Sequence, residues 1–339
     1  VSAVTDGTSV TVDNTHPTLS TPAITVNGAG NANNADTVTL TFTSSSDVTT
    51  APTCAFTDGG GNAMDAGTST ASGNAAGWTC TVAVGDADSD GGMGYSIAFS
   101  DANGNAGTAV TSGSGSVTID NTHPTLSSVS IATAGTGNAN DGDDVTLSFT
   151  ASEGIGTPTC TMKDGGGNTM DNTVSVTEGS SNAWTCVVDT HDNDADGAMT
   201  YSIAFSDDAG NAGTAVTSGS GSVTIDNTHP TMTPVSIAVD NTGNANDGDD
   251  ITLSFTTSEG IQTPTCTFTS GGAAMADGSI TVAEGSNNAW TCVLDVANGD
   301  TDGAVAFSIA FTDDAGNAGT AVSAVTDGTS VTVDNTHPT

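Results

Sequence analysis

Basic side chains are almost absent from this chain of 339 residues. It has one Lys or Arg against 39 Asp and Glu, which gives a formal net charge of −38 at pH 7. Nucleic acids and anionic membrane surfaces are repelled by such a field, so both are excluded as partners. Divalent cations are attracted by it. The carboxylates must therefore be hydrated, as in a high-salt habitat, or held by metal ions.

Aromatic residues and long apolar runs are scarce as well. Phe, Trp and Tyr make up 4% of the chain, and few aromatics with a high net charge ordinarily favour disorder. Regular alternation of apolar and polar residues, together with paired cysteines, favours folded β domains instead. No run of 18 apolar residues occurs, so we expect no membrane insertion.

The motif Asp-Asn-Thr-His-Pro-Thr occurs four times and divides the chain. Its histidines stand at positions 16, 123, 229 and 337, at intervals of 107, 106 and 108 residues. Such intervals are too long for a solenoid repeat and have the size of a whole domain. We therefore expect domains at 19–125, 126–231 and 232–339, with 1–18 as the last strand and joint of a preceding repeat.

The first eighteen residues, Val1 to Thr18, are identical to the last eighteen, Val322 to Thr339. This identity is expected of one period cut from a longer array of three-domain blocks, and a start at Val1 without a signal peptide fits a processed product or a segment. Other copies of the repeat are then the expected partners, in a longer array or a homopolymeric filament. The alternative is that residues 1–13 are a strand donated to a neighbouring molecule.

Seven runs of alternating apolar and small polar residues occupy the middle repeat, separated by Gly, Asn and Asp clusters. Such runs are typical of short strands with one buried face, and seven of them in about a hundred residues predict an all-β Greek-key sandwich of two sheets. The pattern recurs in the other repeats. The residues that mark the seven strands are Val129 and Ile131; Val145, Leu147 and Phe149; Cys160 and Met162; Val174 and Val176; Trp184, Cys186 and Val188; Tyr201, Ile203 and Phe205; and Val216, Val223 and Ile225, the last three in a long strand interrupted by Gly.

The six cysteines allow fifteen pairings, and the repeats favour one of them. Equivalent positions should form equivalent bonds, so we expect disulfides that each span 26 residues, Cys54–Cys80, Cys160–Cys186 and Cys266–Cys292. Reduced cysteines in the core are the alternative. Closing such a loop stabilises a domain by roughly 3 kcal/mol in the chain-entropy account. Disulfides also indicate an extracellular protein, on the cell surface or secreted.

Three phrases of the repeats resemble a known family. They are GDDVTLSFTASEGIGTPTC (Gly142 to Cys160), SDDAGNAGTAV (Ser206 to Val216) and the joint VTIDNTHPTL. They resemble the bacterial immunoglobulin-like and cadherin-like tandem repeats of large secreted surface proteins and adhesins. The resemblance covers all three repeats and implies tandem immunoglobulin-like Greek-key β-sandwiches in a linear array. The cysteines depart from the antibody pattern, because the bond would join the third and fifth strands, so antibody-like sites are not carried over.

The sharpest acidic motif follows the fifth strand. Asp192-x-Asp194-x-Asp196-Gly197 recurs 106 residues away in both directions, with Asn in place of the first Asp in the third repeat, and we name it the acidic turn. It is the first half of a calcium-loop pattern, in which alternate carboxylates surround the cation and Gly permits a sharp turn. The acidic residue at the twelfth position is absent, so the other ligands should come from acids after the first strand and from the joint. An ordinary acidic β-turn is the alternative.

A second acidic set lies at the opposite pole of each sandwich, because consecutive antiparallel strands alternate in direction. Glu153 follows the second strand, and Asp207 with Asn211 follows the sixth. This set resembles the interdomain calcium sites of cadherin-like repeats and would face the joint that leaves the preceding domain. A cation there would turn a flexible string into a stiff rod; the alternative is solvated side chains that cap turns. The first domain departs from the pattern, with Asp47 in an insertion and Asn103 after its sixth strand.

These two patterns give nineteen candidate ligands of Ca²⁺. They are Asp86, Asp88, Asp90, Asp120, Asn121, Asp143, Glu153, Asp192, Asp194, Asp196, Asp207, Asn211, Asp226, Asp249, Glu259, Asp300, Asp302, Asp313 and Asn317.

No catalytic centre is predicted. The histidines of the four joints precede Pro, which favours extended backbone, and no nucleophile recurs at a matching spacing. The sequence therefore predicts a structural extracellular protein rather than an enzyme, a calcium-stiffened stalk or filament. The alternative is an adhesin or glycan-binding module with surface glycans as partners. Loops with few aromatics weigh against that alternative, because contact hot spots favour Trp, Tyr and Arg.

Overall fold

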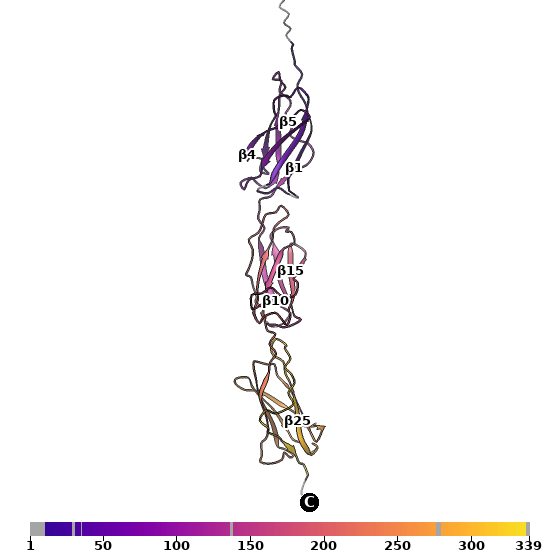
Figure 1. Ribbon diagram of the computed structural model, residues 1–339, viewed down its shortest axis with the longest axis vertical. Helices are drawn as coiled ribbons and strands as arrows, with labels where there is room; N and C mark the ends of the chain where they lie inside the picture. The colour runs from indigo at the N-terminus through magenta and orange to yellow at the C-terminus, as the bar shows by residue number, and fades with distance from the viewer. Residues whose placement is uncertain (1–10, 29–30, 35, 136–137, 276–278, 337–339) are drawn as a thin grey trace, which may run out of the picture.

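The computed structural model describes residues 11–28, 31–34, 36–135, 138–275 and 279–336. Its strands form three sets that follow one another along the long axis of the molecule (Figure 1). Most of the strand expected within residues 1–13, and the histidine at position 337, lie outside the described residues.

The middle domain consists of two sheets. Four strands form the first sheet in the order β10-β12-β15-β14, and the second is built from β13 with β17, and from β18 with β16 and β11. The bounds are β10 (Leu126–Thr133), β11 (Asn138–Ala139), β12 (Asp144–Ala151), β13 (Thr159–Lys163), β14 (Ser175–Glu178), β15 (Ala183–Asp189), β16 (Gly197–Ala198), β17 (Thr200–Ala204) and β18 (Thr224–Ile225).

The outer domains repeat this plan. The first domain has β1 (Leu19–Val26), β2 (Thr37–Ser44), β3 (Thr53–Thr57), β4 (Ala63–Thr70), β5 (Ser72–Asn74), β6 (Gly77–Ala83), β7 (Gly91–Gly92), β8 (Gly94–Ala98) and β9 (Thr118–Ile119). The third has β19 (Met232–Val239), β20 (Asp250–Thr257), β21 (Thr265–Ser270), β22 (Ala273–Ala274), β23 (Thr281–Glu284), β24 (Ala289–Asp295), β25 (Gly303–Ala310) and β26 (Thr332–Val333).

The order of the principal strands identifies the fold. The first, second, fifth and fourth strands form one sheet, and the third, sixth and seventh lie in the other, which is the arrangement of a constant-type immunoglobulin domain. The chain is therefore a tandem array of immunoglobulin-like β-sandwiches, and the predicted all-β fold class is confirmed.

Alternation along the strands builds each core. Side chains of a strand point to opposite faces in turn, so Val145, Leu147 and Phe149 of β12 are all buried. The register sets Phe149 opposite Trp184 and Leu147 opposite Cys186 of β15. The predicted disulfides are confirmed: Cys54–Cys80, Cys160–Cys186 and Cys266–Cys292 join the third to the fifth strand, and thus one sheet to the other, with Cα atoms 6.4 to 6.5 Å apart.

The seventh strand differs from the prediction. Instead of one long strand, Val216 forms a single bridge to Ile203, Ser220 lies parallel to Ser130 of β10, and only β18 is regular. Glycine explains the path, because a Cβ on Gly221, whose φ is +78°, would lie 2.2 Å from the carbonyl oxygen of Ile131. The segment thus closes the edge of β10. No helix among the described residues is long and apolar enough to cross a membrane.

Candidate metal sites at the domain joints

The joint that leaves the first domain is held against two loops of the second. The backbone N–H of Thr125 donates to Oγ of Ser152 at 3.0 Å, and the N–H of Ser152 donates to the carbonyl of Thr125 at 2.9 Å. Buried Ile155 forms a bridge with Asp207, which fixes the loop after β12 beside the loop after β17. Both loops therefore face residues 120–125.

Three carboxylates from two domains converge at this place. One oxygen each of Asp120, Glu153 and Asp207 lies within 4.8 Å of the others. Asp226, Glu259 and Asp313 form the same cluster at the next joint. We call these two groups the joint clusters. Among the described residues, no other group of three Asp, Glu, His or Cys side chains has ligand atoms this close together. Asp207 and Asp313 are buried, with 6% and 1% of their surface exposed.

The joint clusters concentrate negative charge without an internal counter-charge. Burial raises the pKa of the Glu153 carboxyl, and repulsion from Asp120 and Asp207 raises it further. Burial followed by repulsion from Asp226 and Asp313 likewise raises the pKa of Glu259. The whole chain contains a single Lys or Arg side chain, so basic residues cannot offset the charge of both clusters. A cation or a proton among the carboxylates would relieve this repulsion.

Two of the predicted amide ligands, Asn211 and Asn317, link the joint to the cluster through their side-chain nitrogens. Nδ2 of Asn211 donates to the carbonyl oxygen of Asp120 at 2.7 Å and to Oδ2 of Asp207 at 2.9 Å. Asn317 makes the same pair of bonds to Asp226 at 2.7 Å and Asp313 at 2.8 Å. Each amide thereby holds one carboxylate of the following domain beside the backbone of the joint.

The acidic turn does not gather its carboxylates as the calcium-loop prediction required. Asp194 accepts the N–H groups of His191 and Asp171, and Asp196 accepts the N–H of Asn227 and the hydroxyl of Thr228. These oxygens accept hydrogen bonds from the loops and the joint, and calcium binding at the turn stays a prediction.

The other candidates at this pole make hydrogen bonds within the loops, and none belongs to a joint cluster. The carboxylates of Asp86, Asp88, Asp90, Asp143, Asp249, Asp300 and Asp302 accept such bonds, Asn121 donates from Nδ2, and Asp192 donates from its backbone N–H.

The acidic turn nevertheless positions the joint. Asp90 accepts the N–H of Asn121 at 2.7 Å, and Nδ2 of Asn121 donates to the carbonyls of Gly85 and Asp88. Because Asn121 follows Asp120, these bonds fix the carboxylate that the first domain presents to the second. Asp90 also lies close enough to raise the pKa of Glu153.

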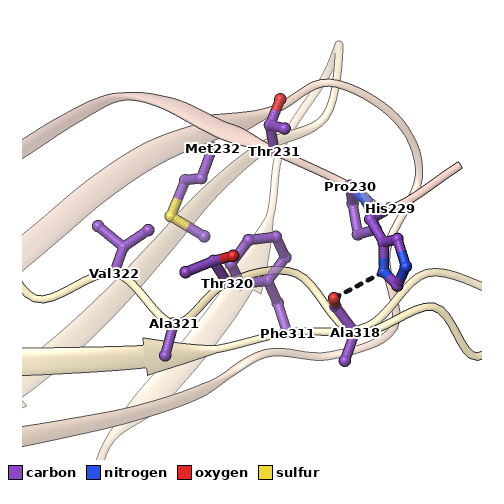
Figure 2. A pocket seen from close by; sticks show the side chains of 9 residues that line it. All are labelled: His229, Pro230, Thr231, Met232, Phe311, Ala318, Thr320, Ala321 and Val322. Atoms are coloured by element: carbon purple, nitrogen blue, oxygen red, sulfur yellow. Dashed lines mark hydrogen bonds between the residues drawn. The ribbon is translucent and has the colours of Figure 1, made fainter.

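The joint histidine contacts the following domain. Nδ1 of His229 lies 3.0 Å from the carbonyl oxygen of Ala318, and Figure 2 shows this bond at the end of a pocket that also contains Phe311 and Met232. His123 makes the same contact with Ala212 at 2.9 Å. The imidazole of each of these histidines therefore links the joint to the domain that follows it.

Sequence reasoning missed two buried carboxylates, Asp58 and Asp164. Asp58 accepts the N–H groups of Ser89 and Asn62, and the first of these bonds does most to lower its pKa to about 2. Asp164 accepts equivalent bonds from Ala195 and Asn168. The sequence feature that could have identified these carboxylates is the phrase DGGGN, which occurs at 58–62 and 164–168. The third repeat has SGGAA at the equivalent positions, 270–274.

Comparisons with known proteins find only distant likenesses among the solved structures. No protein-family profile and no curated protein matches the chain. A tetra-tandem repeat from the extending region of a large adhesion protein is 18% identical, with a TM-score of 0.34 over 94% of this chain and 75% of that one. The ectodomain of mouse nectin-like molecule 4 is 9% identical, with a TM-score of 0.28 over 87% and 96%. Likenesses this distant carry no argument about function.

Proposed function

We propose that this chain is a structural, non-enzymatic part of an extracellular or surface protein, a row of bacterial immunoglobulin-like, cadherin-like domains that Ca²⁺ stiffens into a stalk or filament. The observation that supports it is the joint cluster, in which Asp120 comes from one domain and Glu153 with Asp207 from the next. The same arrangement recurs at Asp226, Glu259 and Asp313.

The chemistry of the joint clusters favours a hard divalent cation. Ca²⁺ takes six to eight oxygen ligands, from carboxylates, carbonyls and water, in a flexible geometry. Three carboxylates that repel one another are stabilised when such an ion lies between them. Because the ion contacts both domains, bending or separating them would break ligand bonds, and the joint becomes stiff.

The disulfides support an extracellular location. All six cysteines are paired, and structural disulfides persist in oxidising compartments and are rare in reducing ones.

Calcium titration of the whole chain tests the proposal. We expect calorimetry to detect binding, and small-angle scattering to show a longer, less flexible particle in Ca²⁺ than in chelator. Glu153→Gln with Glu259→Gln should weaken binding by about tenfold or more, since each change removes a charge from a cluster, a loss of about 1.4 kcal/mol or more per site. Glu178→Gln, on exposed β14, is the matched control and should bind like the wild type. Absence of binding heat together with identical scattering curves would refute the proposal.

The alternative function, an adhesin or glycan-binding module, has less support. Aromatic side chains that could stack on sugars are in the core, with Trp184 5% and Phe205 7% exposed. A glycan array tests it, and a specific sugar ligand would restore it.

A further inference from the structure

The joint that precedes the first domain is built differently from the other two. Asp13 and Asp101 occupy the places that Asp120 and Asp207 have at the next joint, and Asp47 lies in the insertion that replaces Glu153. Among the described residues, these three do not form a cluster of the kind found at the other joints.

At this joint the side-chain amide of Asn103 donates a hydrogen bond, and the other two joints have no side-chain donor at the equivalent position. Nδ2 of Asn103 donates to Oδ2 of Asp13 at 2.8 Å, and the N–H of Asn103 donates to Oδ1 of Asp101 at 2.9 Å. The equivalent residues of the second and third domains are Ala209 and Ala315, which have no side-chain donor.

Two further contacts of the joint recur at all three places. Nδ2 of Asn105 donates to the carbonyl of Asp13 at 3.2 Å, as Asn211 and Asn317 do to theirs, and His16 lies 2.8 Å from the carbonyl of Ala106. The joint before the first domain therefore lacks the Glu and has the added Asn103. It also has Ala102 where the second and third domains have Asp208 and Asp314.

We propose that Asn103 makes this joint independent of the cation, and so determines which joints of the array respond to calcium. This inference rests on the proposed function. A neutral N–H donor satisfies a carboxylate oxygen of Asp13 without bringing a further charge, and the loss of the Glu removes the repulsion that a cation would have to offset. The joint before the first domain then stays ordered when calcium is withdrawn.

One observation defines the competing outcome. Oδ1 of Asp47 is buried without a hydrogen-bond partner, so a cation held by Asp47 at this joint is the alternative. It predicts one more bound Ca²⁺ than the joint clusters account for.

Three equivalent backbone amides report on the three joints. The N–H groups of Thr18, Thr125 and Thr231 each donate to the hydroxyl of a serine in the following domain, Ser45, Ser152 and Ser258. Hydrogen exchange at these amides in the whole chain, followed by NMR in Ca²⁺ and in chelator, measures each joint separately. We expect chelation to accelerate exchange at Thr125 and Thr231 by roughly tenfold, which corresponds to about 1.4 kcal/mol, and to leave Thr18 unchanged.

Two variants of exposed Asn103 sharpen the test. Asn103→Ala should accelerate exchange at Thr18 equally in Ca²⁺ and in chelator. Asn103→Asp replaces the donor by a carboxylate, so protection of Thr18 should become calcium-dependent and one more ion should bind. Asn74→Ala, on exposed β5, is the control and should change neither.

The outcomes separate the two proposals. If chelation accelerates exchange at all three amides, or if the wild type binds three ions, the inference about Asn103 is wrong while the calcium function stands. If chelation changes none of them, the calcium function fails. If Asn103→Ala leaves Thr18 unaffected, Asn103 does not hold the joint.

Discussion

At the scale of single residues, the surroundings of a buried carboxylate decide its part in this chain. Asp164 is surrounded by donors, and the N–H of Ala195 does most to lower its pKa. Glu259 faces other carboxylates, and burial together with their repulsion raises its pKa. The first kind of carboxylate is stabilised by donors of its own loop, whereas the second kind is repelled by its neighbours, and we propose that an ion offsets this repulsion.

Replacing Asp164 tests the first kind. Asp164→Ala leaves the N–H groups of Ala195 and Asn168 without their acceptor, so we expect the melting temperature of the second domain to fall by several degrees. Because folding lowers the pKa of Asp164, its contribution is complete above the unfolded value of about 3.9 and is lost as the pH falls through the lower folded value. Calorimetry between pH 7 and 2 should therefore show the variant and the wild type converging in acid. Asp189→Asn, at the exposed end of β15, is the control and should melt like the wild type. A difference in melting temperature between Asp164→Ala and the wild type that persists at the lowest pH would contradict this explanation.

Residue roles could be predicted from the sequence where strand direction determines them. Glu153 and Asp207 follow strands that end at the same pole, so their meeting with Asp120 follows from counting strands. The carboxylates of Asp194 and Asp196 could not be placed in this way, because they accept hydrogen bonds from segments far away in the sequence, such as the N–H of Asp171 on Asp194 and that of Asn227 on Asp196. Alternate spacing is compatible with an ion or with such donors, and only the path of the loop decides between them.

At the scale of elements, the disulfide links the two sheets of each sandwich through the third and fifth strands. In the second domain it joins β13 and β15, and β13 has β17 as its regular strand partner. The bond thus ties a small sheet to the larger one. The sequence predicted this pairing because the cysteines recur, but it predicted one long seventh strand where glycines let the chain pass from one sheet to the edge of the other.

Removing one disulfide should destabilise one domain only. For Cys160→Ala with Cys186→Ala we expect the second domain to lose roughly 3 kcal/mol of unfolding free energy, from the added freedom of the unfolded loop. Each domain has one tryptophan, Trp78, Trp184 or Trp290, so denaturant titration can be followed by Trp184 fluorescence after the other two are changed to Phe. The same measurement with Trp290 alone is the control and should be unchanged. An equal loss in both domains would mean that they unfold as one unit.

At the scale of the whole molecule, the chain is a row of like-charged bodies (Figure 1). With a net charge of −38, neighbouring domains repel one another, and the repulsion is screened over about 10 Å at 0.1 M salt. The joint clusters bring part of this charge across each boundary. On the proposed function, the alignment of neighbouring domains depends on whether a proton or a metal ion neutralises the joint clusters.

Protons and calcium should each lengthen the array, because either one offsets the repulsion within the joint clusters. Folding of the joint raises the pKa values of Glu153, Glu259 and Asp226, chiefly through burial. Their contribution to joint stability in chelator is thus fully present below the unfolded pKa values and is lost as the pH rises through the folded ones. In chelator, lowering the pH from 7 toward the ordinary carboxyl range should lengthen and stiffen the particle seen by small-angle scattering.

With calcium present, the same protons compete with the ion, so acid should weaken calcium binding while the particle stays extended. Glu153→Gln with Glu259→Gln is the matched variant, because it removes these two titrating groups and should flatten the pH response in chelator. A wild-type particle that shortens on acidification in chelator would show that repulsion within the joint clusters does not control the shape of the array.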